Sequence, residues 1–261
     1  MFRAGVAMVA LLRKRADAMS TPAGASTGRD LKPVVPVSVP AITVYTDAGD
    51  WDDRAHALGG TPTSLFIGFT SRLGSRFGWV NGDGLVEIIV PVNERTEGDT
   101  RGNALTQVAV VVDPARVCED LSTVRSDVKA ALSTLGEARH ELLTPLPLVP
   151  VVPKAMARRL ERMVISTGVI GSSNLGEVAP DANRPDGTDA DFFAARMAEA
   201  LTTADIRRTR GMFFPVVTGR VHGRIFISIG YTNAAGTTTR DELAQRVRET
   251  LADFRLTGIV E

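Results

Sequence analysis

The chain has 261 residues, of which 44% are hydrophobic and 23% are charged, and its 30 basic residues balance its 30 acidic ones. This length is enough for one large domain or two modest ones with a substantial core. The balanced charge gives no electrostatic indication of a nucleic-acid or anionic-membrane partner, and the one cysteine, Cys118, excludes a disulfide framework and a thiolate metal site, as is usual in the reduced cytoplasm.

The first forty residues differ in character from the rest. Residues 3–19 predict an amphipathic or partly buried helix, because the basic residues 13–15 follow its short apolar run, which is the wrong order for a secretory signal. Residues 20–40 are rich in Ser, Thr, Gly and Pro and predict an extended, exposed linker. No apolar run is long enough to cross a bilayer. We therefore divide the chain into an N-terminal helix and linker, 1–40, and one domain, 41–261.

The start of that domain predicts a strand and two helices. Residues 41–46 suit a short strand, and Asp47 can cap a helix that runs through Ala57 before Gly59 and Gly60 end it. A second helix starts at Thr61, because apolar residues recur from there at spacings of three and four. Its buried stripe consists of Leu65 or Phe66, Phe69, Leu73 and Phe77.

Two apolar runs, residues 85–92 and 104–112, predict strands that are covered on both faces, and a turn at residues 81–84 precedes the first. Between the runs lies a polar stretch, Pro91–Ala104, "PVNERTEGDTRGNA". Asp113 and Pro114 are residue types that begin a helix, and Cys118 borders the apolar stripe of that helix as a small core residue. The stripe consists of Val117, Leu121, Val124, Val128, Leu132 and Leu135.

The last hundred residues continue the mixture of helices and strands. They predict a helix at 154–163, a short strand within 164–174, an acidic loop at 179–191, a short helix within 192–201 and a hairpin formed by 211–219 and 223–233. The second hairpin strand alternates Ile225, Ile227 and Ile229 with other residues, which predicts one buried face. Thr239 and Glu242 form a capping box for a last helix. The apolar stripe of that helix consists of Leu243, Val247, Leu251 and Phe254.

No convincing catalytic constellation appears among these residues. His56, His140 and His222 have no metal-ligand spacing, and each is better explained as a surface or turn residue. The stretch "GSSNLG" at 171–176 does not match the GxSxG pattern of a nucleophilic serine, and the sequence contains neither a Walker loop nor GxGxxG. The sequence alone therefore predicts no resident cofactor and no metal site.

Several segments, taken in order, resemble one family. The stretches "AHALGGTPTSLFIGFTSRLGSRFG", "VPVNERTEGDTRGNA", "LTPLPLVPVVPKAMARRLERMVISTGVIGSSNLGEV" and "TGRVHGRIFISIGYTN" resemble the C-terminal half of wax ester synthase/diacylglycerol acyltransferase-like proteins, over roughly residues 50–256. That family is similar to the chloramphenicol acetyltransferase-like superfamily, which includes condensation domains. The resemblance implies an α/β fold, an α+β sandwich that is one half of a chloramphenicol acetyltransferase-like structure, with a mixed sheet flanked by helices.

The resemblance also implies a reaction, in which an acyl group passes from acyl-CoA or a carrier thioester to an alcohol. In the superfamily, a histidine of an HHxxxDG motif acts as the general base, and the Asp of that motif follows the second histidine by four positions. The residues four positions after the three histidines here are Gly60, Thr144 and Phe226, so none of them fits the motif. The catalytic half is therefore expected to lie outside this sequence. This leaves open whether the chain is an enzyme, and whether Met1 is the native start.

The same resemblance suggests which residues lie near a substrate tunnel. It implies that Ser172, Ser173 and Asn174 contact substrate, where a hydroxyl could donate to the oxyanion, although a strand-end turn explains them equally well. It also implies a structural role near the tunnel for Pro91, Arg95, Gly102 and Asn103, with the Arg95 side chain held by an ion pair or by backbone carbonyls. The alternative for Arg95 is a solvent-facing loop residue.

Three functions follow as alternatives from this sequence. The first is a cytoplasmic O-acyltransferase of lipid metabolism, soluble or peripheral to a membrane, that uses acyl-CoA and an alcohol and is inactive without its first half. The second is a non-catalytic module that pairs with a separate N-terminal acyltransferase half or with itself, since an unpartnered sheet exposes an apolar face. The third is a truncated remnant of the enzyme.

Overall fold

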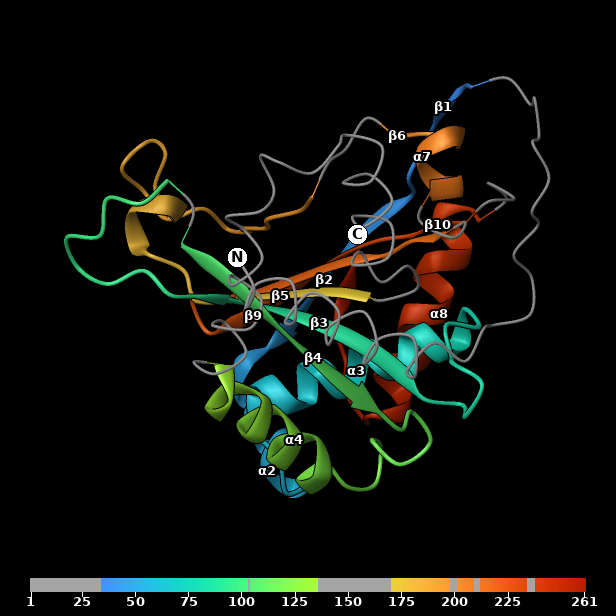
Figure 1. Cartoon of the computed structure of the whole chain (residues 1–261). Helices are drawn as coiled ribbons and strands as arrows, with labels where there is room; N and C mark the ends of the chain where they lie inside the picture. Colours follow the sequence, from blue (N-terminus) through green and yellow to red (C-terminus); the bar gives the residue numbers. More distant parts are fainter. Residues whose placement is uncertain (1–33, 103, 136–169, 198–200, 209–211, 234–237) are drawn as a thin grey trace, which may run out of the picture.

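The computed structural model describes residues 34–102, 104–135, 170–197, 201–208, 212–233 and 238–261. The helices expected at 3–19 and 154–163, most of the expected linker, Asn103 and His140 lie outside the described residues. Within them, the fold is a mixed α/β arrangement with one large sheet flanked by helices, as the sequence indicates (Figure 1).

A seven-stranded sheet has the order β11-β2-β9-β8-β5-β3-β4. Strands β8, β5 and β3 run parallel to one another, and every other neighbouring pair is antiparallel. The strands are β2 (Ala41–Asp47), β3 (Val86–Asn93), β4 (Leu105–Val112), β5 (Ile170–Glu177), β8 (Pro215–Val221), β9 (Arg224–Gly230) and β11 (Ile259–Val260). Two further pairs join β1 (Pro36–Val37) to β6 (Leu201–Thr202) and β7 (Met212–Phe213) to β10 (Thr232–Asn233).

Four helices cover one face of the sheet: α2 (Ala48–Ala57), α3 (Pro62–Arg76), α4 (Ser122–Ser133) and α8 (Arg240–Asp253). The short helix α7 (Thr203–Arg208) and a 3-10 turn, η2 (Pro180–Asn183), complete the described elements. No helix within the described residues is long and apolar enough to cross a membrane.

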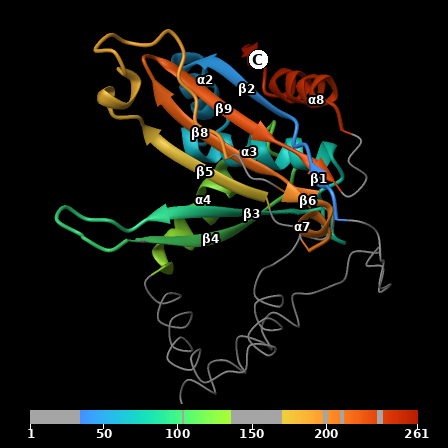
Figure 2. The same ribbon diagram turned by 90° about the horizontal axis from the view of Figure 1, so that it is seen from above.

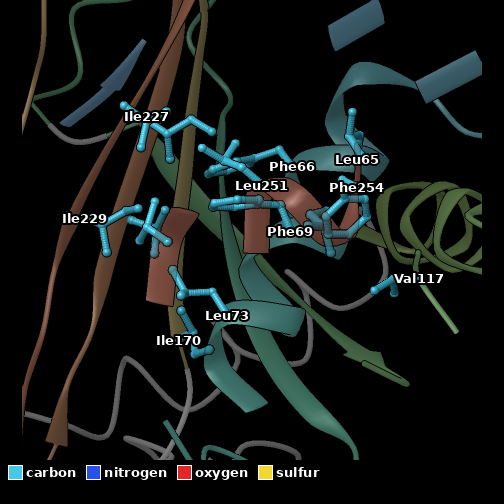
Figure 3. Close-up of a cluster of buried hydrophobic side chains, with 14 of the residues drawn as sticks. Leu65, Phe66, Phe69, Leu73, Val117, Ile170, Ile227, Ile229, Leu251 and Phe254 are labelled. Atoms are coloured by element: carbon cyan, nitrogen blue, oxygen red, sulfur yellow. The ribbon is translucent and has the colours of Figure 1, made fainter. Parts of the chain in front are cut away.

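Helix α3 is the centre of the core. Its side chains meet those of the sheet and of α8 in one buried cluster (Figure 3). The cluster includes Leu65, Phe66, Phe69, Leu73, Val117, Ile170, Ile227, Ile229, Leu251 and Phe254. Two glycines allow the close contacts, because a Cβ atom added to Gly74 would lie 2.4 Å from Ile170 Cδ1, and one added to Gly68 would lie 2.8 Å from Leu121 Cδ2.

Ion pairs hold α3 to α8 at the edge of this core. The Asp253 carboxylate accepts from Arg72 Nε at 2.8 Å and from Arg76 Nη2 at 2.7 Å. Partial burial by itself favours the neutral acid, but the two guanidinium groups outweigh it and lower the pKa of Asp253. The carboxylate therefore remains charged and bonded at neutral pH.

The opposite face of the sheet, which we call the helix-free face, is covered at one side only. Residues 178–195 cross it there, and Val178, Phe193 and Ala195 pack against a small cluster of Tyr45, Val217 and Phe226. On β3 and β4, residues of this face such as Ala109 and Val111 are exposed, with Val111 at 49%. The expectation that residues 104–112 are covered on both faces is therefore wrong, because only the face toward α4 is packed.

Several helix boundaries are confirmed, with their caps. The Asp47 carboxylate accepts from the Asp50 backbone N–H at 3.0 Å, as expected for the start of α2. Thr61 caps α3 in a reciprocal capping box with Ser64. Thr239 accepts from the Glu242 N–H at the start of α8, but the Glu242 side chain bonds Arg246 at 2.9 Å, so only one half of the expected box is present.

The helix expected from Asp113 is the clearest error. Residues 114–119 form turns, and α4 begins only at Ser122, whose backbone N–H donates to the Asp120 carboxylate. The turns keep local bonds to Asp113 O and Arg116 O, but the Leu121 N–H donates to Leu58 O and Cys118 O accepts from Arg54. Cys118 borders the core as expected, whereas the stripe residue Leu132 is 42% exposed.

Two smaller expectations also fail. Residues 192–197 are not helical, and their aromatic side chains instead pack against the sheet, while the short helix lies later, in α7. Strand β9 is buried on both faces from Ile225 onward, because Phe226 is covered by residues 178–195 while the isoleucines face the helices. The hairpin of β8 and β9 and the turn at 81–84 are confirmed.

The close contact at Gly74 can be tested by filling it. Gly74→Val should lower the free energy of unfolding by at least about 2 kcal/mol, because the added atoms overlap the buried Ile170 side chain. The exposed Ala130 of α4 is the matched control, and Ala130→Val should cost only about 0.5 kcal/mol through helix propensity. Urea unfolding measures both, and equal losses would contradict the tight α3–β5 contact.

Candidate functional site

The parallel strands β5 and β3 are paired over two residues only and then diverge, at a point that we call the parting. Their register pairs only Ile88 with Ile170 and Ile89 with Gly171. Beyond that point β3 continues alongside β4 to Asn93, while β5 continues alongside β8. Figure 2 shows the two strands diverging toward their carboxyl ends. Each strand keeps its partner on the far edge, β4 for residues 90–93 and β8 for residues 172–174. On the edges that face each other, residues 90–93 and 172–175 pair with no strand among the described residues.

The Ser-Asn segment lies on the diverging part of β5, and its side chains alternate between the two faces of the sheet. Ser172 faces the helices and is fully buried. Ser173 faces the helix-free side and is half-buried, and Asn174 is exposed at the helix-covered side. The three residues therefore do not form one cluster, and Ser173 is the hydroxyl that the helix-free face presents.

Asn174 fixes the local path of β5. Its side-chain oxygen accepts from the Gly176 N–H at 2.9 Å, and its amide nitrogen lies 3.4 Å from the Thr63 hydroxyl at the start of α3. Gly176 has a φ of 67°, which favours glycine, and the register of β5 with β8 shifts between Asn174 and Glu177. A bulge supported by α3 therefore turns the end of β5 away from a regular path.

Two buried hydroxyls lie between α3 and β5. Thr63, Thr70 and Gly74 share one stripe of α3 by their spacing, and the two ends of that stripe meet Asn174 and Ile170. Thr70 thus lies on this stripe between the two contacts, as Ser172 lies between Ile170 and Asn174 on β5. Among the described residues, neither the Thr70 nor the Ser172 hydroxyl has a hydrogen-bond partner.

Small and apolar side chains lie beside the parting on the helix-free face. Gly171 is exposed, and a Cβ added to it would meet no atom of the described residues within 4 Å. On the neighbouring strands, Ile89 and Pro91 are half-buried and Ala109 is exposed. The polar residues of this face nearest the parting are Ser173 on β5, Gln107 opposite Pro91, and Glu87 two positions before Ile89.

The loop between β3 and β4 is held together by its own arginines. Arg95 donates to the backbone carbonyls of Asp99 at 3.0 Å and Arg101 at 2.9 Å, which is one of the two ways expected for its side chain. Arg101 binds the Asp99 carboxylate at 2.6 Å, and these bonds are the largest cause of the lowered pKa of Asp99. Gly102 is exposed beside them. The nearness of this loop to a tunnel stays a prediction.

Neither described histidine lies on β3 or β5. His56 is exposed on α2, and His222 lies in the turn between β8 and β9. Within the described residues, no three His, Cys, Asp or Glu side chains form a group that could hold a metal ion. The part of the chain that the structure describes offers a strand-lined surface with hydroxyl and amide groups, and the titratable residues on the two strands that part are Glu87 on β3 and Glu177 at the end of β5.

No protein-family model and no curated protein sequence matches the chain. Solved structures do match, at low identity. The cyclization-docking bidomain of the EpoB nonribosomal peptide synthetase of Sorangium cellulosum has a TM-score of 0.54 and 14% identity, over 97% of this chain and 48% of that chain. The PapA2 acyl transferase has a TM-score of 0.52 and 11% identity, over 95% and 52%.

A condensation domain involved in chain release from the enacyloxin polyketide synthase has a TM-score of 0.51 and 13% identity, over 96% of this chain and 47% of that chain. The chain thus spans about half the length of the solved chains that it matches. At these identities the likeness shows the fold alone, which is that of condensation domains and related acyltransferases.

Sequence reasoning selected the Ser-Asn segment but missed how it is held. The parting of β5 from β3 and the contact of Asn174 with Thr63 depend on residues far apart in the sequence. The sequence signal of an irregular strand is the pair of glycines on either side of the segment, Gly171 and Gly176, because glycine within a strand often marks a bulge. Thr63 carried no signal, because its partner lies 111 positions away.

The unpartnered hydroxyls can be tested by an isosteric exchange. Thr70→Val should leave the free energy of unfolding unchanged or raise it by up to about 1 kcal/mol, because it removes a buried hydroxyl with no bonding partner among the described residues. Thr218→Val is the matched control, since the buried Thr218 hydroxyl donates to Phe226 O at 2.8 Å, and its loss should cost about 1–3 kcal/mol. A comparable loss in both variants, measured by urea unfolding, would mean that Thr70 does have a bonding partner.

Proposed function

We propose that this chain forms one half of an acyltransferase-type site, in which the parted edges of β3 and β5 bind the thioester donor of the acyl group. The observation that carries the proposal is the divergence of these strands after Ile89 and Gly171, within a fold that condensation domains and acyltransferases share. The donor is acyl-CoA or an acyl group on a carrier protein.

The chemistry of the donor suits the diverging edges. The flexible arm of coenzyme A and of carrier proteins contains two amide groups and ends in the thioester. Backbone N–H and C=O groups on a strand edge bond extended amides in the manner of an added strand. The small and apolar surroundings of Gly171 leave room on the helix-free face for the arm and for an acyl chain.

The transfer itself needs a base, and among the described residues no histidine lies on β3 or β5. The alcohol oxygen bonds to the thioester carbon, its proton passes to the base, and the carbon–sulfur bond breaks to release a thiol. Removal of a general base typically costs about 10²–10⁴-fold in rate. We therefore assign the base to a polypeptide region outside this sequence, and the Ser173 hydroxyl to hydrogen bonding of the oxyanion.

The resemblance to wax ester synthase/diacylglycerol acyltransferase-like proteins suggests an acyl-CoA or carrier-bound acyl donor, an alcohol acceptor and a role in cytoplasmic lipid metabolism. In that setting Arg95 and Pro91 would stabilise the tunnel wall. A second function, a non-catalytic module that pairs with another half-domain or with its own copy, is favoured by the exposed apolar residues Ala109 and Val111 on the uncovered part of the sheet.

The donor proposal is tested by adding a side chain at Gly171, beside the point where β3 and β5 diverge. Octanoyl-CoA should bind the chain in a calorimetric titration, and Gly171→Val should weaken that binding at least tenfold, because the new side chain occupies open space next to Ser173 without a clash in the free protein. Ala109→Val, on the same face and two strands from β5, should change the affinity less than about twofold.

The two functions give different outcomes in this titration. No binding of octanoyl-CoA to the unmodified chain, or equal weakening in both variants, would contradict a donor site at the parting and favour the pairing module. Sedimentation analysis of the same samples then reports whether the chain associates with itself.

A further inference from the structure

The turn between β8 and β9 holds a histidine in a backbone conformation that suits other residues better. His222 and Gly223 form a two-residue connection with φ angles of 47° and 69°. Turns of this kind, with both φ values positive, favour Asn-Gly because Asn tolerates the left-handed region. Histidine is, with Asn and Asp, among the non-glycine residues that adopt this region most often, so the turn can carry an imidazole at this position.

The His222 side chain borders a cavity of about 230 Å³ between this turn and residues 189–193. The cavity has aromatic side chains in its wall, from Tyr45, Phe192, Phe193 and Phe226, together with charged and polar ones. These rings also contact one another, with centroids 4.9 Å apart for Tyr45 and Phe192 and 5.6 Å apart for Phe193 and Phe226. The aromatic part of the wall therefore consists of two pairs of rings in contact.

The charged groups around the cavity have both signs. Asp189 binds Arg184 Nε at 2.7 Å and lies 3.4 Å from His222 Nε2. The Arg224 guanidinium lies over the Phe192 ring, 4.9 Å from its centroid. The wall has two carboxylates, Asp189 and Asp191, and one guanidinium group, Arg224, and Arg184 beside it adds a second guanidinium group. A charged ligand would therefore meet like charge as well as opposite charge.

We propose that this cavity binds a small neutral aromatic alcohol, with His222 as its polar anchor. The aromatic walls favour a planar ring. A hydroxyl group both donates and accepts, and so can bond an imidazole nitrogen and a neighbouring carboxylate or guanidinium group at once. His222 Nε2 lies 3.4 Å from the Asp189 carboxylate, which places a carboxylate beside the imidazole.

This site is separate from the proposed donor site. Its lining comes from β2, the β8–β9 hairpin and residues 189–193, with no residue from β3 or β5. The proposal therefore does not rest on acyl transfer. Gly171→Val should leave the cavity intact, so failure at one site is distinguishable from failure at the other.

The test is a titration of the full chain, labelled with ¹⁵N-histidine, with benzyl alcohol as the probe. The imidazole resonances of His222 should shift and saturate, while those of the exposed His56 should not. Toluene has the same ring without the hydroxyl and should bind at least about fivefold more weakly, for want of one hydrogen bond. Linear, unsaturated shifts, or equal shifts at both histidines, would overturn the proposal.

A variant that keeps the turn geometry distinguishes the loss of the imidazole from a loss of folding. His222→Asn suits the positive φ and should leave the chain folded, with an unchanged or higher unfolding midpoint. Binding of benzyl alcohol, followed by the resonances of ¹³C-labelled Phe193, should weaken at least about fivefold. His56→Asn is the control and should bind as the unmodified chain does. Equal binding by both variants would remove His222 from the site.

Discussion

The rest of the described structure depends on the burial of helix α3 from every side. Residues 64–71 of this helix are buried without a break, since the sheet lies on one side and α2, α4 and α8 on the others. A helix in that position has no solvent-facing stripe. Gly68 and Gly74 let it approach α4 and β5 more closely than any side chain would allow.

That burial also sets the position of β5. The strand is pressed against α3 at Ile170 and meets the start of the helix again at Asn174. Between these two points it leaves β3 and follows β8. The parting of the sheet is therefore the result of a strand anchored to a helix at Ile170 and Asn174, and the facing edges of residues 90–93 and 172–175 pair with no strand among the described residues.

Sequence patterns predicted the elements with strong local signals and missed those that depend on distant contacts. Asp47, Thr61 and Thr239 marked their helix starts correctly, because a cap bonds the next turn of the same chain. Asp113 misled, because tertiary bonds to Leu58 O and from Arg54 hold residues 114–121 in turns. The Ser-Asn segment was found by resemblance, whereas its support by Thr63 required the structure.

The central claim is that the parted edges of β3 and β5 bind a thioester donor. Hydrogen exchange of backbone amides, measured by mass spectrometry with and without octanoyl-CoA, tests it most directly. The account predicts slower exchange at residues 90–93 and 172–175 in the presence of the donor, with little change in α4 or α8. Unchanged exchange in both segments, with or without protection elsewhere, would contradict it.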